Sequence, residues 1–268
     1  MLSLCRPSAL PRRWGSRLAL SLAALGLASS CRLLGLRGEG SSQVGSSLTS
    51  SPLWRDGRTL AGTLSPEDRI NPQDGSFWDE ISITSQPGQI LIAALESEDF
   101  DAYLELVDGQ GRVIGFDDDS GPDVNALLAV RLPEGGTYTL RATSFEPEST
   151  GNYRLTYVLT QIDWQQTMSG RLEEGSLQHP EDGSWMDEYP IAARAGQILI
   201  ASLASADFDA FLQLLDPSGE VVAWDDDQGG GTDALMIAFL PRTGTYTLRA
   251  NTYGPGEKGA YELQYTLR

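Results

Sequence analysis

The sequence has few of the residues that most catalytic centres require. Two cysteines, Cys5 and Cys31, and a single histidine, His179, occur among its 268 residues. Both cysteines precede the repeats described below, so no disulfide can stabilise the folded part, which must rely on hydrophobic cores or metal ions. No Ser-His-Asp or Cys-His set can be assembled from this inventory, and His179 is expected at the surface of a loop. Zinc-ligand patterns and phosphate-binding glycine loops are also missing. We therefore predict that the protein is not an enzyme and has no catalytic residues.

Acidic residues outnumber basic residues in this sequence. The formal net charge is −18, and because no Asp or Glu precedes Glu39, the rest of the chain is more acidic than this total indicates. Such acidity argues against the phosphate backbone of a nucleic acid as a partner. It is compatible with a well-solvated surface and with the binding of divalent cations.

No apolar run is long enough to span a bilayer comfortably. The run over 18–28, about 11 residues, follows a basic segment, so residues 1–30 are predicted to be an export signal. The sequence Ala28-Ser29-Ser30-Cys31 resembles a bacterial lipobox, which makes Cys31 the predicted lipidated residue and membrane anchor. Ordinary signal cleavage, with secretion, and retention of the segment as an anchor are the alternatives. Residues 31–52, rich in glycine and serine, are predicted to be a flexible tether.

The chain contains two copies of one sequence. Sliding it against itself by 108 residues aligns 62–160 with 170–268 without a gap, and 47 of the 99 aligned pairs are identical. This period is too long for a solenoid unit, so each copy is expected to have a core of its own. We predict a first domain over 53–160, a linker over 161–169 and a second domain over 170–268.

Short strand-like runs alternate with turn residues in each copy, and no helical period stands out. Strands are predicted in the first copy near 58–64, 77–84, 89–96, 101–107, 112–117, 126–132, 137–144 and 152–159. Strands at this spacing are typical of an antiparallel sandwich. The predicted fold is all-β, with two tandem antiparallel β-sandwich domains of jelly-roll type.

One predicted β-hairpin gathers carboxylates at its open end. The segment Asp108-Gly109-Gln110-Gly111 indicates a type I turn that ends in a left-handed glycine. This turn would place Leu104 opposite Phe116, and Asp101 opposite Asp119. Like charges directly across a strand pair destabilise a sheet, so either water screens these carboxylates or a cation lies among them.

Calcium is the predicted cofactor, because carboxylate and amide oxygens are the ligands that Ca²⁺ prefers. Each copy offers a hairpin cluster and one residue of the following loop. The predicted ligands are Asp101, Asp117, Asp118, Asp119 and Asn125 in the first copy, and Asp209, Asp225, Asp226, Asp227 and Asp233 in the second. Second-rank candidates are Asp79, Glu80, Asp187 and Glu188. The alternative is a solvated acidic loop in which some aspartates cap turn amides.

Aromatic residues occur on both faces of the predicted hairpin. On the predicted register, Phe116 and Trp224 point inward and belong to the core. Tyr103 and Phe211 fall on the opposite face, as do parts of the neighbourhoods of Trp78 and Phe145. An exposed aromatic strip on a sandwich can bind a polysaccharide or an extended polypeptide, so Tyr103 and Phe211 are the candidate ligand-binding residues. A partly covered sheet face is the alternative.

A series of short motifs occurs in the same order in both copies. In the first copy they are Asp74-Gly75-Ser76-Phe77-Trp78-Asp79-Glu80, Pro87-Gly88-Gln89, Asp99-Phe100-Asp101-Ala102-Tyr103-Leu104, Asp117-Asp118, Leu132-Pro133 with Gly136-Thr137-Tyr138, and Gly151 with Tyr153. This series resembles the bacterial pre-peptidase C-terminal (PPC) domain over essentially all of 58–268. The resemblance implies a β-sandwich module of secreted bacterial proteins, often found at the end of extracellular peptidases. Related modules in clostridial collagenases bind calcium and collagen. A departure from the family's pattern is that no peptidase domain precedes the modules here.

These observations predict an exported, non-catalytic accessory or binding protein of the bacterial cell envelope. It would face the periplasm or the exterior, anchored to the outer or plasma membrane through Cys31, or be secreted. The expected partner is an extracellular polymer, either protein or polysaccharide, or another envelope protein. A structural spacer without a specific ligand is the alternative, and a hydrolase that uses paired carboxylates is the third possibility.

Overall fold

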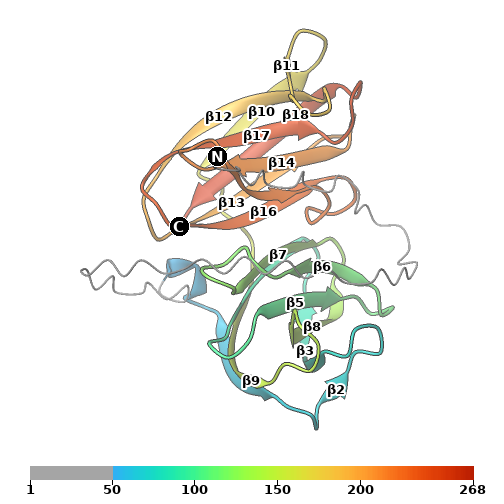
Figure 1. The fold of residues 1–268 in the computed structure, drawn as a ribbon. Helices are drawn as coiled ribbons and strands as arrows, with labels where there is room; N and C mark the ends of the chain where they lie inside the picture. Colours follow the sequence, from blue (N-terminus) through green and yellow to red (C-terminus); the bar gives the residue numbers. More distant parts are fainter. Residues whose placement is uncertain (1–50) are drawn as a thin grey trace, which may run out of the picture. The chain divides into compact units, whose positions relative to one another are not determined.

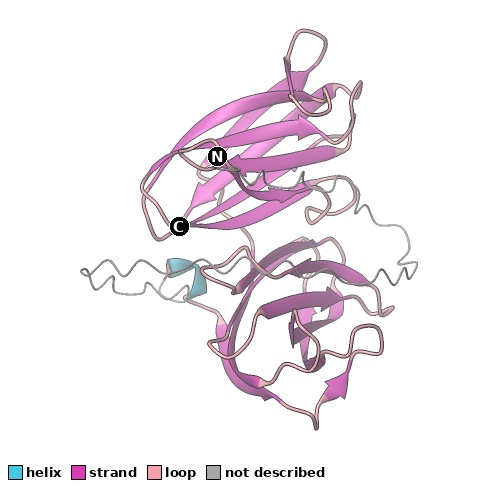
Figure 2. Ribbon diagram, in the orientation of Figure 1, coloured by secondary structure: helices cyan, strands magenta, loops and turns pink. Residues whose placement is uncertain are grey.

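The computed structural model describes residues 51–268, drawn as a ribbon in Figure 1 with labels on many of the strands. Apart from one 3₁₀ turn, Pro52–Trp54, this part of the chain consists of strands joined by turns and loops (Figure 2). The predicted signal over 1–30, the predicted lipidation site Cys31 and nearly all of the predicted tether lie outside the described residues. No described helix has the length and apolar character needed to cross a bilayer.

The first repeat contains nine strands and the second repeats them in the same order. The first nine are β1 (Arg58–Leu64), β2 (Arg69–Ile70), β3 (Phe77–Ser85), β4 (Gln89–Glu96), β5 (Ala102–Val107), β6 (Val113–Asp117), β7 (Ala126–Leu132), β8 (Gly136–Ser144) and β9 (Gly151–Thr160). The others are β10 (Gln166–Leu172), β11 (Leu177–Gln178), β12 (Trp185–Ala193), β13 (Gln197–Ala204), β14 (Ala210–Leu215), β15 (Val221–Asp225), β16 (Ala234–Leu240), β17 (Gly244–Thr252) and β18 (Gly259–Leu267).

The predicted strands of the first copy are confirmed, and each bound is within one residue of the predicted position. The two-residue strands β2 and β11 were not predicted, because so short a segment carries no alternation of apolar and polar residues. Strand β10 begins at Gln166, so the segment between the last strand of one repeat and the first of the next is 161–165.

Each repeat forms two antiparallel sheets that face each other as a sandwich. In the first repeat the four-stranded sheet has the order β1-β9-β4-β7, and the five-stranded sheet has the order β2-β3-β8-β5-β6. The second repeat has the same orders, β10-β18-β13-β16 and β11-β12-β17-β14-β15. The predicted all-β sandwich architecture is therefore confirmed.

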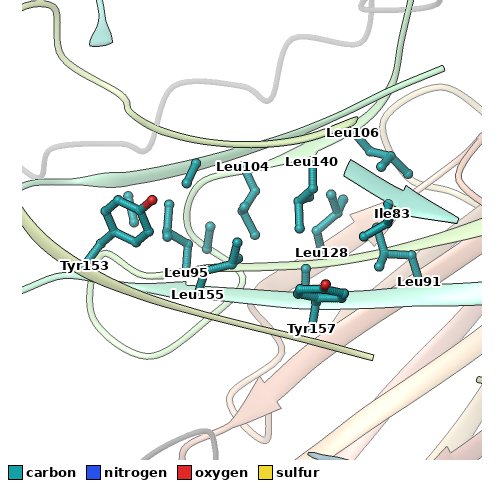
Figure 3. Packing of buried hydrophobic residues seen from close by; sticks show 14 of the residues in the cluster. Ile83, Leu91, Leu95, Leu104, Leu106, Leu128, Leu140, Tyr153, Leu155 and Tyr157 are labelled. Carbon is teal, nitrogen blue, oxygen red and sulfur yellow. The ribbon is translucent and has the colours of Figure 1, made fainter. Parts of the chain in front are cut away.

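A hydrophobic core fills the space between the two sheets of each repeat. Figure 3 shows the first core, where Leu104 and Leu140 of the five-stranded sheet point toward Leu128 and Leu155 of the four-stranded sheet. All four side chains are almost completely buried. Strands β5 and β8 alternate buried and more exposed residues along much of their length, because successive side chains of a strand point to opposite faces. The second repeat has an equivalent core of its own.

Strands β4, β7, β13 and β16 are different, because both of their faces are buried. Leu91 and Leu95 of β4 belong to the core of the first sandwich, whereas Ile90 and Ile92 belong to a separate apolar cluster. That cluster also contains residues of the second repeat, including Ile200 of β13. Continuous apolar runs are typical of strands that are covered on both sides. The four-stranded sheets of the two repeats therefore bury their outer faces in one shared cluster.

Reciprocal hydrogen bonds accompany this shared cluster. The N–H of Arg131 donates to the carbonyl of Gln228 (2.9 Å), and the N–H of Phe239 donates to the carbonyl of Ser120 (3.4 Å). Arg131 and Phe239 are equivalent positions, 108 residues apart, and so are Ser120 and Gln228. Each bond is therefore the counterpart of the other, as in an isologous two-fold interface. The two repeats meet as a pseudo-symmetric pair.

The shared cluster predicts matched costs for matched truncations. Ile92→Ala and Ile200→Ala each remove a fully buried side chain from equivalent strands. Each should lower the free energy of unfolding by about 2–5 kcal/mol, measured by urea denaturation. The control Val222→Ala, at a half-exposed position, should cost less than about 0.5 kcal/mol. A cost for Ile92→Ala as small as that of the control would contradict burial of this face.

Candidate functional site

The hairpin β5–β6 differs by one residue from the predicted register. Phe116 pairs with Glu105 rather than with Leu104, and Leu104 pairs with Asp117. The cause is a β-bulge near the turn, which leaves Ile114 of β6 without a partner on β5. The predicted turn itself is present, with a left-handed glycine at its end, so the error came from the bulge alone.

A one-residue shift exchanges the two faces of a strand. Phe116 and Trp224 consequently face solvent, with 51% and 48% of their surfaces exposed, and the prediction that both belong to the core was wrong. The inward positions are occupied by Gly115 and Ala223. A Cβ atom on Gly115 would lie 2.4 Å from the side chain of Val130, so the core has no room for a larger residue there.

Two equivalent groups of aromatic side chains lie on the outer faces of the five-stranded sheets. We call them the first trio (Tyr103, Phe116 and Phe145) and the second trio (Phe211, Trp224 and Tyr253). In the first trio the ring of Tyr103 lies 6.1 Å from Phe116 and 6.4 Å from Phe145, between centroids. In the second trio Phe211 lies 6.0 Å from Trp224 and 6.1 Å from Tyr253. These separations are those of favourable aromatic pairs.

The local backbone positions the three rings in the same way in both trios. Tyr103 lies on the outer face of β5 because its neighbours Ala102 and Leu104 point into the core. The third ring follows the end of β8 or β17, where the N–H of Phe145 donates to the carbonyl of Asp101 (2.9 Å). In the second trio the N–H of Tyr253 donates in the same way to Asp209, at 2.8 Å.

The structure places Tyr103 and Phe211 as the sequence predicted, on the face opposite the core and half-buried. Phe116 and Trp224 were misplaced in the core and Tyr253 was missed, whereas Phe145 was expected near this face only as part of a neighbourhood. A signal for them exists in the repeat, because all three trio positions are aromatic in both copies although none has the same residue in both. That pattern retains the aromatic character and not the shape of the side chain, as expected of a surface without tight packing.

Two members of the first trio, Tyr103 and Phe145, border a groove of about 260 Å³. Its lining combines aromatic rings with amide, hydroxyl and carboxylate groups: Asn71, Gln73, Asp74, Ser76, Tyr103, Glu105, Thr143, Ser144 and Phe145. Binding sites commonly combine apolar surface with a few polar groups that orient the ligand.

The same sheet face already holds one guanidinium group on an aromatic ring. Arg141 of β8 lies over the ring of Trp78, 4.2 Å from its centroid. Its N–H groups also reach the carboxylates of Glu80 (3.2 Å) and Glu105 (3.3 Å). The chemistry of this face therefore suits a planar cation.

Two of the predicted calcium ligands hold their own loops together. The carboxylate of Asp117 accepts hydrogen bonds from the Leu127 N–H (2.7 Å) and from the Ser120 hydroxyl (2.5 Å). Asp225 accepts a bond from the Leu235 N–H at the same distance, 2.7 Å. The oxygens of these two aspartates close the loops that follow β6 and β15.

A second pair of predicted ligands ties the same loops to a neighbouring turn. The side-chain oxygen of Asn125 accepts a hydrogen bond from the Ser97 N–H (3.0 Å). Asp233 accepts one from the Ser205 N–H (3.2 Å). The exchange of Asn for Asp between the repeats thus preserves an acceptor at this position.

The remaining predicted ligands come together in two acidic clusters. The first acidic cluster consists of Asp101, Asp118, Asp119 and Glu146, and the second of Asp209, Asp226, Asp227 and Glu257. Neither glutamate was predicted. No ion pair within residues 51–268 involves a member of either cluster. Asp101 and Asp209 each have a buried Oδ1 atom without a hydrogen-bond partner among the described residues.

Within residues 51–268, no three His, Cys, Asp or Glu side chains come together in an arrangement that could hold a metal ion. The second-rank candidates are engaged elsewhere: Asp79 accepts a hydrogen bond from the Tyr153 hydroxyl, and Asp187 from the Tyr261 hydroxyl, both at 2.6 Å. His179 was predicted at the surface, but the structure buries it to 5% exposure. Calcium binding remains a prediction.

The clusters create a strongly negative environment beside the trios. Burial, followed by repulsion from Asp227 and Glu257, raises the pKa of Asp209 to about 6. Burial and then the charges of Asp119 and Asp118 also raise the pKa of Asp101. The pKa of the Tyr103 hydroxyl is raised by burial and by carboxylates that include Asp118.

Comparisons with known proteins do not identify the chain. No family model and no curated protein matches it. Among solved structures it is similar to PliG of Aeromonas hydrophila, a periplasmic inhibitor of g-type lysozyme, with a TM-score of 0.30 and 16% identity over 41% of this chain and 93% of that one. It is also similar to PNGase F, a glycosylasparaginase of Flavobacterium meningosepticum, with a TM-score of 0.21 and 8% identity over 79% and 99%. At these scores the likenesses carry no functional argument.

The raised pKa values predict that the protein is more stable in mild acid than at neutral pH. Burial raises the pKa of Asp117 and Asp226 to about 6, as for Asp209, whereas the unfolded chain should titrate near 3.9. The folded state therefore binds more protons between these values, and this stabilisation is present below pH 4 and lost as the pH rises through 6.

The urea midpoint should consequently be higher at pH 5.0 than at pH 7.5. Asp209→Asn with Asp226→Asn should reduce the difference between the two midpoints, because two of the shifted groups are removed. A midpoint that is equal at both pH values, or lower at pH 5.0, would contradict this electrostatic description.

Proposed function

We propose that the chain is an exported, non-catalytic binding protein whose two aromatic trios contact an extended extracellular polymer. The observation that carries this proposal is the matched exposure of aromatic rings at equivalent positions of the two repeats. Four of the six rings are exposed: Phe116, Phe145, Trp224 and Tyr253. The exposed fraction is largest for Phe145, at 59%, and smallest for Tyr253, at 36%. Exposed aromatic clusters of this kind typically mark interaction sites.

A spacer without a ligand would not account for this surface. Hiding an aromatic side chain from water contributes roughly 1.5–3 kcal/mol to stability, so each exposed ring is a stabilisation that the fold leaves unused. The repeats bury other apolar surface efficiently, including the shared cluster between them. Exposure of two rings in each repeat, beside a third that is half-buried, is better explained by a ligand that covers them. Aromatic residues are also enriched among those that dominate binding energy.

The cellular context is part of the proposal. A signal over 1–30 and lipidation of Cys31 would place the repeats at the cell envelope, and the resemblance to PPC domains suggests an extracellular accessory role. Tandem sites suit a repetitive ligand, since linked sites bind a polymer more tightly than either site alone. The groove beside the first trio, which combines polar groups with aromatic rings, is compatible with a polysaccharide or an extended polypeptide.

Calcium stabilisation of the acidic clusters is a second, separate proposal. Its support is the set of carboxylates that repel one another, with one buried and unpartnered oxygen on Asp101 and on Asp209. A divalent cation would relieve this repulsion. It would bind the remaining oxygens of the clusters and not those of Asp117 and Asp225, which accept hydrogen bonds from their own loops.

Binding by the trios is tested by removing their outermost rings. Phe116→Ser with Trp224→Ser changes two half-exposed side chains, so stability should change little. Retention on immobilised peptidoglycan, exopolysaccharide and fibrous protein should fall about tenfold for whichever matrix binds the unchanged protein. The matched control, Val113→Ser with Val222→Ser, removes exposed apolar residues outside the trios and should retain binding. Equal retention by both variants, or no retention of the unchanged protein on any matrix, would favour a spacer.

The calcium proposal is tested by thermal unfolding in EDTA and after calcium is restored. A ligand that binds the folded state alone, at one hundred times its dissociation constant, adds about 2.7 kcal/mol of stability. The unfolding midpoint should rise by several degrees, and Asp101→Asn with Asp209→Asn should abolish the rise. An unchanged midpoint at millimolar calcium would show that the clusters are solvated loops.

A further inference from the structure

We infer that the trios bind cationic side chains, and that the polymer is an extended polypeptide segment rich in arginine. In this arrangement each guanidinium group stacks on the rings of a trio, and its N–H groups reach the adjacent acidic cluster. The inference rests on the proposed function and names the class of its ligand.

The backbone places each trio directly beside its acidic cluster. Tyr103 lies two residues after Asp101, and Phe116 lies two residues before Asp118. Phe145 is hydrogen-bonded through its N–H to the carbonyl of Asp101, and Glu146 follows it in the chain. Every ring of the first trio is therefore within two residues of a carboxylate of the first acidic cluster.

The second repeat preserves the same juxtaposition with different rings. Phe211 lies two residues after Asp209, and Trp224 two residues before Asp226. The N–H of Tyr253 donates to the carbonyl of Asp209. Two copies that differ at each aromatic position thus keep rings and carboxylates together, which points to a ligand that uses both.

Charge complementarity selects a cation for this surface. The face of an aromatic ring attracts a cation, and carboxylates strengthen the attraction through charge-assisted hydrogen bonds. The acidic clusters take part in no ion pair within residues 51–268. The whole chain carries a formal charge of −18, which favours the approach of a basic partner and disfavours an anionic polysaccharide.

The protein's own Arg141 shows which cation suits the face. Its guanidinium lies 4.2 Å from the centroid of Trp78 and is bound by the carboxylates of Glu80 and Glu105. A trio with its acidic cluster offers the same two components to a side chain from outside. Arginine suits this geometry better than lysine, because its planar group stacks on a ring while it donates several hydrogen bonds.

The neighbourhoods of Phe116 and Trp224 meet at the contact between the two repeats. The side-chain amide of Gln228 approaches the carbonyl of Phe116 at 3.5 Å, and Gln228 is four residues from Trp224. Four extended residues span at most about 14 Å, so backbone positions of the two trios lie within roughly 25 Å of each other. An extended segment of about nine residues covers that distance, which is why an oligopeptide with several arginines is the expected ligand.

The test is isothermal titration of the full-length protein with nona-arginine, nona-lysine and the neutral oligosaccharide cellohexaose. Nona-arginine should bind most tightly, and its affinity should fall as salt is raised from 50 to 500 mM. Phe116→Ser with Trp224→Ser should weaken nona-arginine binding about tenfold and remove its advantage over nona-lysine. Asp118→Asn with Asp226→Asn should weaken binding of both peptides.

A charge-matched control separates the site from general attraction between opposite charges. Glu67→Gln with Glu174→Gln removes two exposed carboxylates outside the clusters and should change either affinity by less than about twofold. If this control weakens nona-arginine binding as much as Asp118→Asn with Asp226→Asn does, the inference is overturned.

The remaining outcomes distinguish this inference from the proposed function. Binding of cellohexaose that depends on Phe116 and Trp224, without binding of nona-arginine, would overturn the cationic ligand and leave the proposed function standing. If Phe116→Ser with Trp224→Ser binds every probe as well as the unchanged protein does, both the inference and the proposed function would be overturned. A dimer in sedimentation experiments that this variant abolishes would mean that the trios are covered by a second copy of the chain, and it would also overturn the inference.

Discussion

The packing of β6 against the neighbouring sheet is the constraint on which the candidate site depends. At Gly115 the core has no space for a Cβ atom, because Val130 fills it. The adjacent Phe116 must therefore point outward, where it lies beside Tyr103. In the second repeat Ala223 is buried and Trp224 is exposed in the same way. In the first sandwich a limit on volume thus determines that Phe116 is presented on the surface, and the second sandwich keeps the same arrangement around a small residue.

Pseudo-symmetry connects this local constraint to the arrangement of the two repeats. The loop after β6 is closed by Asp117, and the carbonyl of its Ser120 accepts a hydrogen bond from the N–H of Phe239 in the second repeat. The corresponding loop, closed by Asp225, makes the reciprocal bond through Gln228. Aspartates that resembled metal ligands in the sequence therefore shape the contact between the repeats. The carboxylates of the two acidic clusters, which have no ion-pair partner among residues 51–268, make the surface beside the trios negatively charged.

Sequence patterns predicted the strands well and the site less well, for physical reasons. Alternation and turn residues locate strands such as β5 and β8 to within a residue, because burial of one face is a local signal. The bulge at Ile114 gives no such signal, since it depends on packing between sheets, and it reversed the predicted direction of Phe116. The gathering of Asp101 with Glu146 was also hidden, because Glu146 reaches the cluster from the end of β8.

Hydroxyl-radical footprinting with mass spectrometry would test whether the exposed rings of the trios bind a polymer. It measures the oxidation of each ring in the free protein and in the presence of a polymer that the protein binds. If the trios bind a polymer, Phe116, Phe145 and Trp224 should be oxidised rapidly in the free protein, and the polymer should protect all three. Tyr246, which is buried in the second core with 1% exposure, should react slowly in both states. Slow oxidation of Phe116 and Trp224 in the free protein would contradict the exposure of these rings. Rapid oxidation that the polymer does not reduce would contradict their role in binding.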